Sequence, residues 1–188
     1  MARGVRDRMV QSAIALLAKR GYQATSFSEV LAESAAPRGS IYHHFPEGKD
    51  QLIAAAIEVS GARAVALLDG LDGLGATEIV DGFMAMWRAV LQLSTFSAGC
   101  SVLAVTVSAD SPGLLEQAAD IFRRWQARLA ELLVGSGMPA ADAASFATLL
   151  IAASEGAVVL ARAEQSFAPF DAVHARLRDG VAGHGPNH

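Results

Sequence analysis

The sequence contains one cysteine, Cys100, among its 188 residues. A single thiol excludes an internal disulfide framework, and it cannot build a zinc site based on cysteine ligands. Although 52% of the residues are hydrophobic, no uninterrupted apolar run reaches the roughly 18 residues that span a membrane. The apolar stretch that follows MARGVRDRMVQ is cut short by Lys19 and Arg20, unlike that of a signal peptide. We therefore expect a cytoplasmic protein without a membrane partner.

Groups typical of an enzyme site are scarce. The sequence shows no nucleophile–base pair, no metal-ligand cluster and no phosphate-cradling glycine loop. His43 and His44 are adjacent, and adjacent side chains on a helix point about 100° apart, so they are poorly placed to share a metal ion. Cys100 is a candidate nucleophile, but its apolar surroundings, SAGCSVLAVTVSA, favour a small buried thiol. We expect neither metal nor cofactor, and an enzyme built on a helical body is the rival hypothesis.

Charge is distributed unevenly along the chain. The formal net charge is −4, which by itself argues against a nucleic-acid partner. Residues 1–50, however, hold seven Lys or Arg against five Asp or Glu, whereas residues 51–188 hold eight against fourteen. A mildly basic head on an acidic body suggests two tasks in one chain, although so small a difference also arises by chance.

Apolar residues at helical spacing, punctuated by glycine and proline, predict an all-α chain. Gly21 follows the first helix as a stop signal, and Ser26 with Glu29 has the spacing of a capping box before the second. Pro37 suits the first turn of a short third helix, and Pro46 ends it. Helices are predicted over residues 5–20, 27–34, 37–44, 48–68, 76–93, 98–109, 112–135, 139–164 and 169–181.

The second and third predicted helices are short and are joined by a tight turn, which is typical of a helix-turn-helix. The second helix of such a unit fits the major groove of DNA. Arg38 can donate a bidentate pair to guanine, Ser40 and His43 can bond base edges or phosphates, and Tyr42 can reach a phosphate. Gly39 allows the backbone to come close.

Two helix starts nearby are candidate phosphate seats. Lys49, in the first turn of a helix, opposes the helix dipole, and a docked phosphate would reverse that penalty. Thr25 and Ser26 precede the second helix and offer a similar seat. The predicted DNA-binding residues are therefore Thr25, Ser26, Pro37, Arg38, Gly39, Ser40, Tyr42, His43 and Lys49.

The segment RGSIYHHFPEGKDQL, with Thr25-Ser26 and Leu31-Ala32 before it, resembles the DNA-binding head of the tetracycline-repressor (TetR) family. The matching pattern is a tyrosine, a phenylalanine, a lysine and a leucine, at Tyr42, Phe45, Lys49 and Leu52. Three positions depart from the family pattern: Ala35 stands for the usual turn glycine, Pro37 for the usual capping serine, and Gly48 is an addition.

Two later motifs narrow the resemblance. Gly99-Cys100 and EGA-x-x-LAR at residues 155–162, together with PRGSIYHHFP-x-GK, look like the LmrA/YxaF-type branch, whose members resemble repressors of drug-export genes. The resemblance implies an N-terminal three-helix helix-turn-helix domain over residues 1–50. It also implies a helical ligand-binding and dimerisation domain over residues 51–188.

Large apolar side chains gather on the helices predicted at 76–93 and 112–135. Any helical core shows such stripes, so plain packing is one interpretation. The other is a cavity for an effector, which the resemblance implies, and the scarcity of charge predicts a small apolar or aromatic molecule. The predicted lining residues are Phe83, Met84, Trp87, Cys100, Phe122 and Trp125.

The segment FATLLIAASEGAVVLA, residues 146–161, presents a wide apolar face. Burial inside one chain is one interpretation. A two-fold homodimer is the preferred one, because a single short reading helix covers too few base pairs. The predicted dimer-interface residues are Phe146, Leu149, Leu150, Ala153, Ala157 and Leu160.

These observations predict a transcriptional regulator rather than an enzyme. We expect a repressor that binds a palindromic double-stranded DNA operator as a homodimer and is released by a small apolar or aromatic effector. An activator, or a regulator without a small-molecule ligand, is the alternative.

Overall fold

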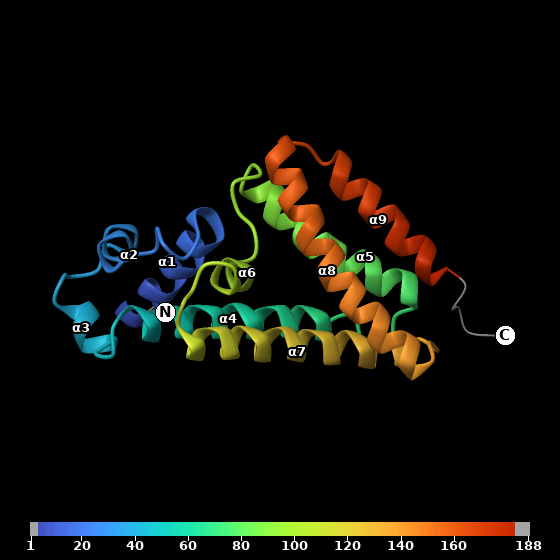
Figure 1. The fold of residues 1–188 in the computed structure, drawn as a ribbon, viewed down its shortest axis with the longest axis horizontal. Helices are drawn as coiled ribbons and strands as arrows, with labels where there is room; N and C mark the ends of the chain where they lie inside the picture. The colour runs from blue at the N-terminus through green and yellow to red at the C-terminus, as the bar shows by residue number, and fades with distance from the viewer. Residues whose placement is uncertain (1–3, 183–188) are drawn as a thin grey trace. The chain divides into compact units, whose positions relative to one another are not determined.

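The computed structural model describes residues 4–182, and every element assigned there is an α-helix (Figure 1). Most predicted bounds agree with the observed ones to within one residue. The helices are α1 Val5–Arg20, α2 Phe27–Ser34, α3 Ser40–His44, α4 Lys49–Asp69, α5 Ala76–Leu93, α6 Ser101–Thr106, α7 Pro112–Gly135, α8 Ala140–Glu164 and α9 Ala168–Val181. The predicted all-α fold is confirmed.

The described chain forms two compact units. The first joins residues 1–62 to residues 100–121, and the second joins residues 63–99 to residues 122–188. Helices α4 and α7 therefore each contribute to both units. The boundary predicted near residue 50 stays a prediction, because the first compact unit holds more than the three N-terminal helices.

The first unit is built around the apolar face of α1. Met9, Ala13 and Leu17 are fully or almost fully buried, as is Phe45 at the end of α3. Burial of each large side chain contributes roughly 1.5–3 kcal/mol of transfer free energy. Helices α2, α3 and α6 all pack against α1, so the short helices are held in place by tertiary packing rather than by their own length.

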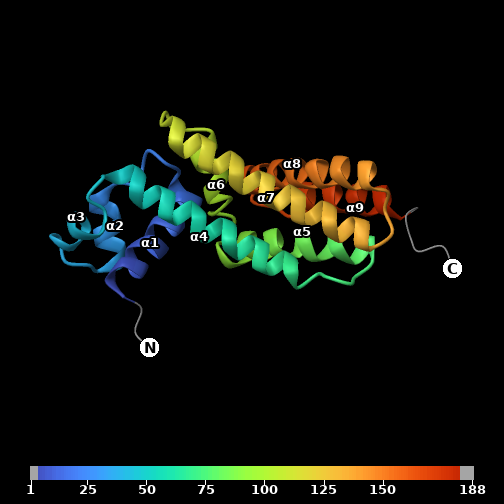
Figure 2. The ribbon, with the colours of Figure 1, turned by 90° about the horizontal axis from the view of Figure 1, so that it is seen from below.

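The second unit is a bundle in which α5 and α8 both pack against α9 (Figure 2). Its inner face carries Phe83, Met84 and Phe170 at almost no exposure. Polar contacts fasten α5 to α9 at the rim: Arg88 pairs with Asp171. Arg88 also lies over the ring of Phe167, 4.4 Å from its centroid. Such exposed pairs add little energy individually but fix the register of the helices.

Two predicted helices are shorter than expected. Pro37, Arg38 and Gly39 precede α3 as a turn in which the amide of Ser40 donates to the carbonyl of Pro37 at 2.9 Å. Helix α6 spans Ser101–Thr106 instead of residues 98–109. Both differences concern helix ends, where turns compete with the helical hydrogen-bond pattern.

Helices α4 and α8 are long and apolar enough to cross a membrane by length and composition alone. The core helices of globular proteins satisfy the same criterion. Both helices bury one side within the packed units, for example Ile57 on α4 and Leu150 on α8. Burial accounts for part of their hydropathy, since 33% of the apolar window of α4 and 44% of that of α8 are buried.

Candidate nucleic-acid interface

Helix α2 begins as the capping-box spacing predicted, but only half of the box forms. The hydroxyl of Ser26 accepts a hydrogen bond from the amide of Glu29 at 3.2 Å. The carboxylate of Glu29 instead pairs with Arg20 at 2.7 Å. This arrangement satisfies one free amide of α2 and ties α2 to the end of α1.

The turn between α2 and α3 depends on Ala35. This residue has φ 50° and ψ 35°, in the left-handed region. A side chain there costs roughly 1–2 kcal/mol, which is why glycine is favoured at such positions. Ala35 therefore keeps the conformation of a glycine turn at an energetic cost.

Helix α3 turns a polar side outward. Arg38, Gly39, Tyr42 and His43 are exposed, with 69% of the surface of Tyr42 accessible. On the opposite side of the helix, Ile41 is fully buried. The outward side chains supply a guanidinium, a phenol and an imidazole on about one and a half turns, which suits hydrogen bonding to base edges and phosphates.

Neighbouring groups fix the side chains of Tyr42 and Ser40. The ring of Tyr42 meets the ring of Phe27 edge to face, with centroids 5.8 Å apart, so α3 is braced against the first residue of α2. The hydroxyl of Ser40 donates to the carbonyl of Pro37 at 2.5 Å, and its lone pairs can still accept. Pro37 itself is exposed at the start of this turn.

The two histidines are placed differently. His43 is exposed and His44 is half-buried, and their ring centroids lie 5.2 Å apart. Within residues 4–182, no three potential metal-ligating side chains gather in one place. The ring of His43 is exposed, and its predicted contact with DNA stays a prediction.

Lys49 makes an internal contact that the sequence did not reveal. Its Nζ donates to the carbonyl of Tyr22 at 2.8 Å and lies 3.9 Å from the centroid of the Tyr22 ring. The hydroxyl of Tyr22 donates to Asp50 at 2.9 Å. Burial lowers the pKa of Lys49, partly offset by Asp50. Burial, followed by the hydrogen bond to Asp50, raises the pKa of Tyr22.

This contact gives Lys49 a structural role in the head. The ammonium donates to a carbonyl that follows α1, and it ties the start of α4 to the loop that leads into α2. An ammonium group has three donors, so a phosphate oxygen can still accept a hydrogen bond from an N–H of Lys49 that Tyr22 does not use. The predicted phosphate contact of Lys49 stays a prediction.

Thr25 is placed differently from the expectation. Its side chain is fully buried and its hydroxyl donates to the carbonyl of Gly21 at 2.8 Å. The hydroxyl therefore closes the turn after α1 instead of facing outward. A DNA contact at Thr25 could only involve its backbone, whereas the half-buried Ser26 beside it caps α2.

Within the first unit, hydrogen bonds join α6 and α7 to α4, and join the loop between α6 and α7 to the loop after α1. Gln23 donates to the carbonyl of Ser108 at 3.2 Å. The hydroxyls of Ser101 and Ser60 lie 3.0 Å apart, and Gln117 donates to the carbonyl of Ala54 at 3.1 Å. The sequence gave no signal for these contacts, because each joins residues at least 41 positions apart.

The predicted ligand-lining residues are mostly buried in the core. Phe83, Met84, Trp87 and Trp125 are at most 8% exposed, and Phe122 is half-buried with its ring 5.3 Å from that of Trp125. These five belong to the second unit, whereas Cys100 belongs to the first. The Sγ of Cys100 accepts from the amide of Leu103 at 3.3 Å, so this buried thiol caps α6.

The predicted dimer face of α8 divides between inside and outside. Leu150 and Ala157 are buried in the chain's own core, so they do not form an outward surface. Leu149 and Leu160 are 54% and 49% exposed, and Ala153 is half-buried. The outward apolar face is thus displaced around the helix from the predicted one. It comprises Ser145, Leu149, Ala152, Gly156, Val159, Leu160 and Ala163.

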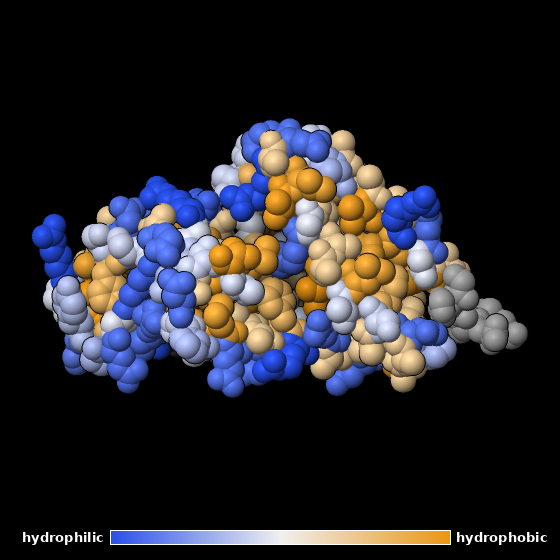
Figure 3. Space-filling view, viewed as in Figure 1, coloured by the Kyte–Doolittle hydropathy of each residue, from blue (hydrophilic) through white to orange (hydrophobic). Residues whose placement is uncertain are grey.

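We call these seven residues the outer face of α8. None of them is charged, and Figure 3 shows hydrophobic side chains reaching the surface over this helix. Val159 is 51% exposed. Contiguous exposed apolar side chains of this kind are unusual on a monomer and mark an interaction surface.

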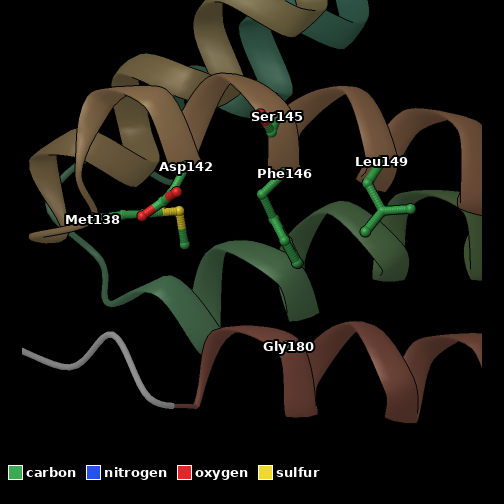
Figure 4. A pocket seen from close by; sticks show the side chains of 6 residues that line it. All are labelled: Met138, Asp142, Ser145, Phe146, Leu149 and Gly180. Atoms are coloured by element: carbon green, nitrogen blue, oxygen red, sulfur yellow. The ribbon is translucent and has the colours of Figure 1, made fainter.

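Two shallow hollows adjoin this face. The first, of about 350 Å³, is lined by Met138, Asp142, Ser145, Phe146, Leu149 and Gly180 (Figure 4). The half-buried ring of Phe146 projects from α8, and a Cβ on Gly180 of α9 would lie 3.1 Å from it. The second, of about 440 Å³, is lined by Phe96, Ser97, Val159, Arg162, Ala163 and Gln165. The predicted ligand-lining residues line neither of these two hollows.

The second unit brings the two later sequence motifs together. Arg162 donates to the carbonyl of Ser97 at 3.1 Å. A Cβ on Gly99 would lie only 2.8 Å from a guanidinium nitrogen of Arg162, so a glycine allows this close approach. Thr95 and Phe96, just before, both have left-handed backbones, with φ 51° and 57°. Arg162 thus holds a strained loop that leads into α6.

An outward polar helix supported by α1 and α2, with a helical region after it, defines the class of helix-turn-helix transcriptional regulators. Residues 10–56 match the family described as bacterial regulatory proteins, tetR family. Residues 76–176 match the transcriptional regulator LmrA/YxaF-like C-terminal domain. The chain belongs to the TetR family of transcriptional regulators, as its head motif suggested.

Relatives and solved structures agree with this assignment. An HTH-type transcriptional regulator of Mycobacterium tuberculosis strain H37Rv is 37% identical over 94% of this chain and 93% of its own length. The HTH-type transcriptional regulator LmrA of Bacillus subtilis strain 168 is 26% identical over 87% and 89%. A TetR transcriptional regulator from Legionella pneumophila has the same fold, with a TM-score of 0.85 and 24% identity over 96% and 100%. Proteins of this family are regulators rather than enzymes, and they bind DNA and act as dimers.

Proposed function

We propose that this protein is a repressor that binds a palindromic DNA operator as a homodimer and is released by a small, mainly apolar effector. The observation that carries the proposal is the polar surface of α3 and the turn before it, where Tyr42, His43 and Arg38 are exposed while Ile41 anchors the helix. A helix supported in this way can enter the major groove and present its side chains to bases. Such a regulator works in the cytoplasm, where the DNA is.

In the proposed DNA surface, some residues contact base edges and others contact phosphates. Arg38, the adjoining Pro37 and Gly39, and His43 meet base edges. Tyr42 and Ser40 meet the flanking phosphates. Ser26 and Lys49 contribute phosphate contacts from the starts of α2 and α4, where backbone amides are available to an anion. This surface explains how a chain of net negative charge can bind DNA, because only its head meets the phosphates.

The outer face of α8 is the proposed dimer surface. A chain that exposes Leu149, Val159 and Leu160 together gains free energy by burying them against a second copy. Small residues between them, Ala152 and Gly156, allow two helices to approach closely. Two heads on one palindrome then bind far more tightly than one, because the second contact is intramolecular.

Effector release requires that events in the second unit alter the head. The chain passes between the units at residues 62–63, 99–100 and 121–122. On the head side of these crossings, α6 and α7 are hydrogen-bonded to the loop after α1 and to α4 through Gln23, Ser60 and Ala54. A coupling free energy of about 1–3 kcal/mol, typical of allosteric proteins, would change operator affinity roughly 5–150-fold.

The test is fluorescence anisotropy of labelled DNA from upstream of this protein's own gene. Binding is measured across a salt series and against random DNA of equal length, because phosphate contacts make affinity fall steeply with salt. Selected random sequences provide a second source of operator. Sedimentation of the same complexes gives the number of chains bound.

We expect tight, salt-sensitive binding to one palindromic sequence by an even number of chains. The proposal fails if neither the upstream DNA nor any selected sequence is preferred over random DNA. Transcription of a reporter behind the operator separates the alternatives: a rise on addition of the protein makes it an activator and contradicts repression.

A further inference from the structure

Trp87 carries a buried hydrogen-bond donor that the described chain does not satisfy. Its side chain is 8% exposed, and its Nε1 has no hydrogen-bond partner among residues 4–182. An amide-like donor left unpaired inside a protein costs about 1–3 kcal/mol. Native proteins keep few such groups, and those that they keep call for a specific explanation.

Two other buried donors among the described residues are satisfied by backbone carbonyls. The hydroxyls of Ser136 and Ser154 donate to the carbonyls of Leu133 and Ile151, at 2.7 and 2.9 Å. Trp125 is 4% exposed, against 8% for Trp87, and its nitrogen is not among the buried polar atoms that lack a partner. Trp87 therefore differs from these buried donors, because its N–H has no partner within the described chain.

The surroundings of Trp87 suit an organic molecule. Its neighbours on the buried side of α5 are Phe83, Met84 and Leu91. Aromatic and thioether groups adapt to flat apolar molecules, and methionine in particular repacks at low cost. Helix α8, which packs against α5, buries five small residues among larger ones such as Leu150 and Ile151, and the small side chains leave the larger groups of α5 room to rearrange. The five small residues are Ala143, Ala147, Ser154, Ala157 and Ala161.

We infer that the effector presents a hydrogen-bond acceptor to Nε1 of Trp87, and that its remaining body is flat and apolar. Ketones, quinones and lactones have this chemistry. A hydrocarbon lacks the acceptor, and a molecule whose only polar groups are donors leaves the indole nitrogen unpaired. The inference deepens the proposed function, because it assumes that an effector enters the second unit, and it narrows the effector to an apolar acceptor.

The test uses the two indole N–H signals of the full chain, which contains two tryptophans. Trp87→Phe and Trp125→Phe variants assign these signals in proton–nitrogen NMR spectra. The probes are matched pairs of a ketone and its hydrocarbon: cyclohexanone and cyclohexane, 1-indanone and indane, 9-fluorenone and fluorene. Each pair keeps the carbon skeleton and differs in the carbonyl.

A ketone of at least one pair should move the Trp87 indole proton downfield and leave the Trp125 proton nearly unchanged. For that pair, the ratio of ketone affinity to hydrocarbon affinity should be about fivefold larger in the wild-type chain than in the Trp87→Phe variant. Fivefold is the effect of one net hydrogen bond. The wild-type signal shift does not depend on any variant folding.

The inference is overturned if hydrocarbons bind as tightly as their ketones in the wild-type chain, or if no ketone moves the Trp87 signal. Operator binding by the same preparation, without probes, is measured separately by anisotropy. If the chain binds its operator but no ketone moves the Trp87 signal, the proposed function stands and this inference fails. If the Trp87 signal responds to a ketone but the chain binds no operator, the contact with Trp87 stands and the proposed function fails.

Discussion

Helices α3 and α8 both leave one side facing outward, and their outward side chains have opposite chemistry. Around α3, Arg38, Tyr42 and His43 offer hydrogen-bond donors and acceptors. The outer face of α8 offers Leu149, Val159 and Leu160 without a single charge. A polar outward helix costs nothing in water and can bind a polar surface, whereas an apolar one is stabilised only when something covers it.

The two helices also differ in how they are supported. Helix α3 has five residues and cannot be stable alone, so its position depends on Ile41, Phe45 and the edge contact of Tyr42 with Phe27. Helix α8 has 25 residues and buries a continuous inner side. Substitutions on the outward side of either helix should therefore change binding, whereas substitutions beneath α3 should also displace it.

The largest effect is expected on the apolar helix. Leu160→Glu places a charge on the outer face of α8, where burying it against a second copy would be costly. We expect the dimer to separate in sedimentation experiments and operator affinity to fall about 10²–10⁴-fold, as one head is lost from each complex. Leu93→Glu is the control, because Leu93 is 88% exposed at the end of α5. An intact Leu160→Glu dimer would remove α8 from the interface.

The next effect is expected on the polar helix. Arg38→Ala should cost about 1–3 kcal/mol of binding and relax the base preference at one operator position, as loss of a bidentate guanine contact does. Arg20→Ala is the matched control, because Arg20 is exposed in the same head but paired with Glu29. Anisotropy on single-base operator variants measures both. An equal loss on all sequences would make Arg38 a phosphate contact.

Lys49 tests whether support and binding can be separated. Lys49→Ala should lower the free energy of unfolding by about 1–2 kcal/mol, because a charged hydrogen bond and a ring contact to Tyr22 are lost. It should also reduce the salt slope of DNA binding by about one unit if the ammonium meets a phosphate. Urea unfolding and the salt series read the two effects separately. A stability loss with an unchanged slope would leave Lys49 with its structural role alone.

The smallest effect concerns the turn beneath α3. Ala35→Gly should raise the free energy of unfolding by about 0.5–1 kcal/mol, since relief of the left-handed strain exceeds the added freedom of the unfolded chain. Ala32→Gly, in the helical interior of α2, should lower it by about 0.5–1 kcal/mol. Thermal unfolding followed by circular dichroism compares them. The strain argument fails if both variants are destabilised alike.

The sequence predicted most helices because their ends carry local signals. Gly21, Ser26 and Pro112 act within a few residues of themselves, so the bounds of α1, α2 and α7 could be predicted closely. Helix α3 began later than predicted, since Pro37 forms a turn with Ser40 instead of a helical first turn. Local propensity cannot distinguish a turn from a helical first turn at Pro37, because both conformations satisfy the fixed φ of proline.

The candidate sites were harder to predict because they depend on distant contacts. Nothing local shows that Lys49 meets Tyr22, 27 residues earlier, or that Thr25 turns its hydroxyl inward. On α8, each residue advances the side-chain direction by about 100°, so Leu149 and Leu150 point to quite different sides. The apolar pattern of residues 146–161 identified the helix, but it could not tell which of its two apolar sides faces the core.

The close approach of Gly99 to Arg162 has a consequence for the history of the family. A Cβ at position 99 would require the flexible end of the Arg162 side chain to shift, and the same guanidinium donates to the carbonyl of Ser97. We therefore expect these two positions, 63 residues apart in the chain, to vary together among relatives. In lineages where the glycine has been replaced, we expect the arginine to have been replaced as well.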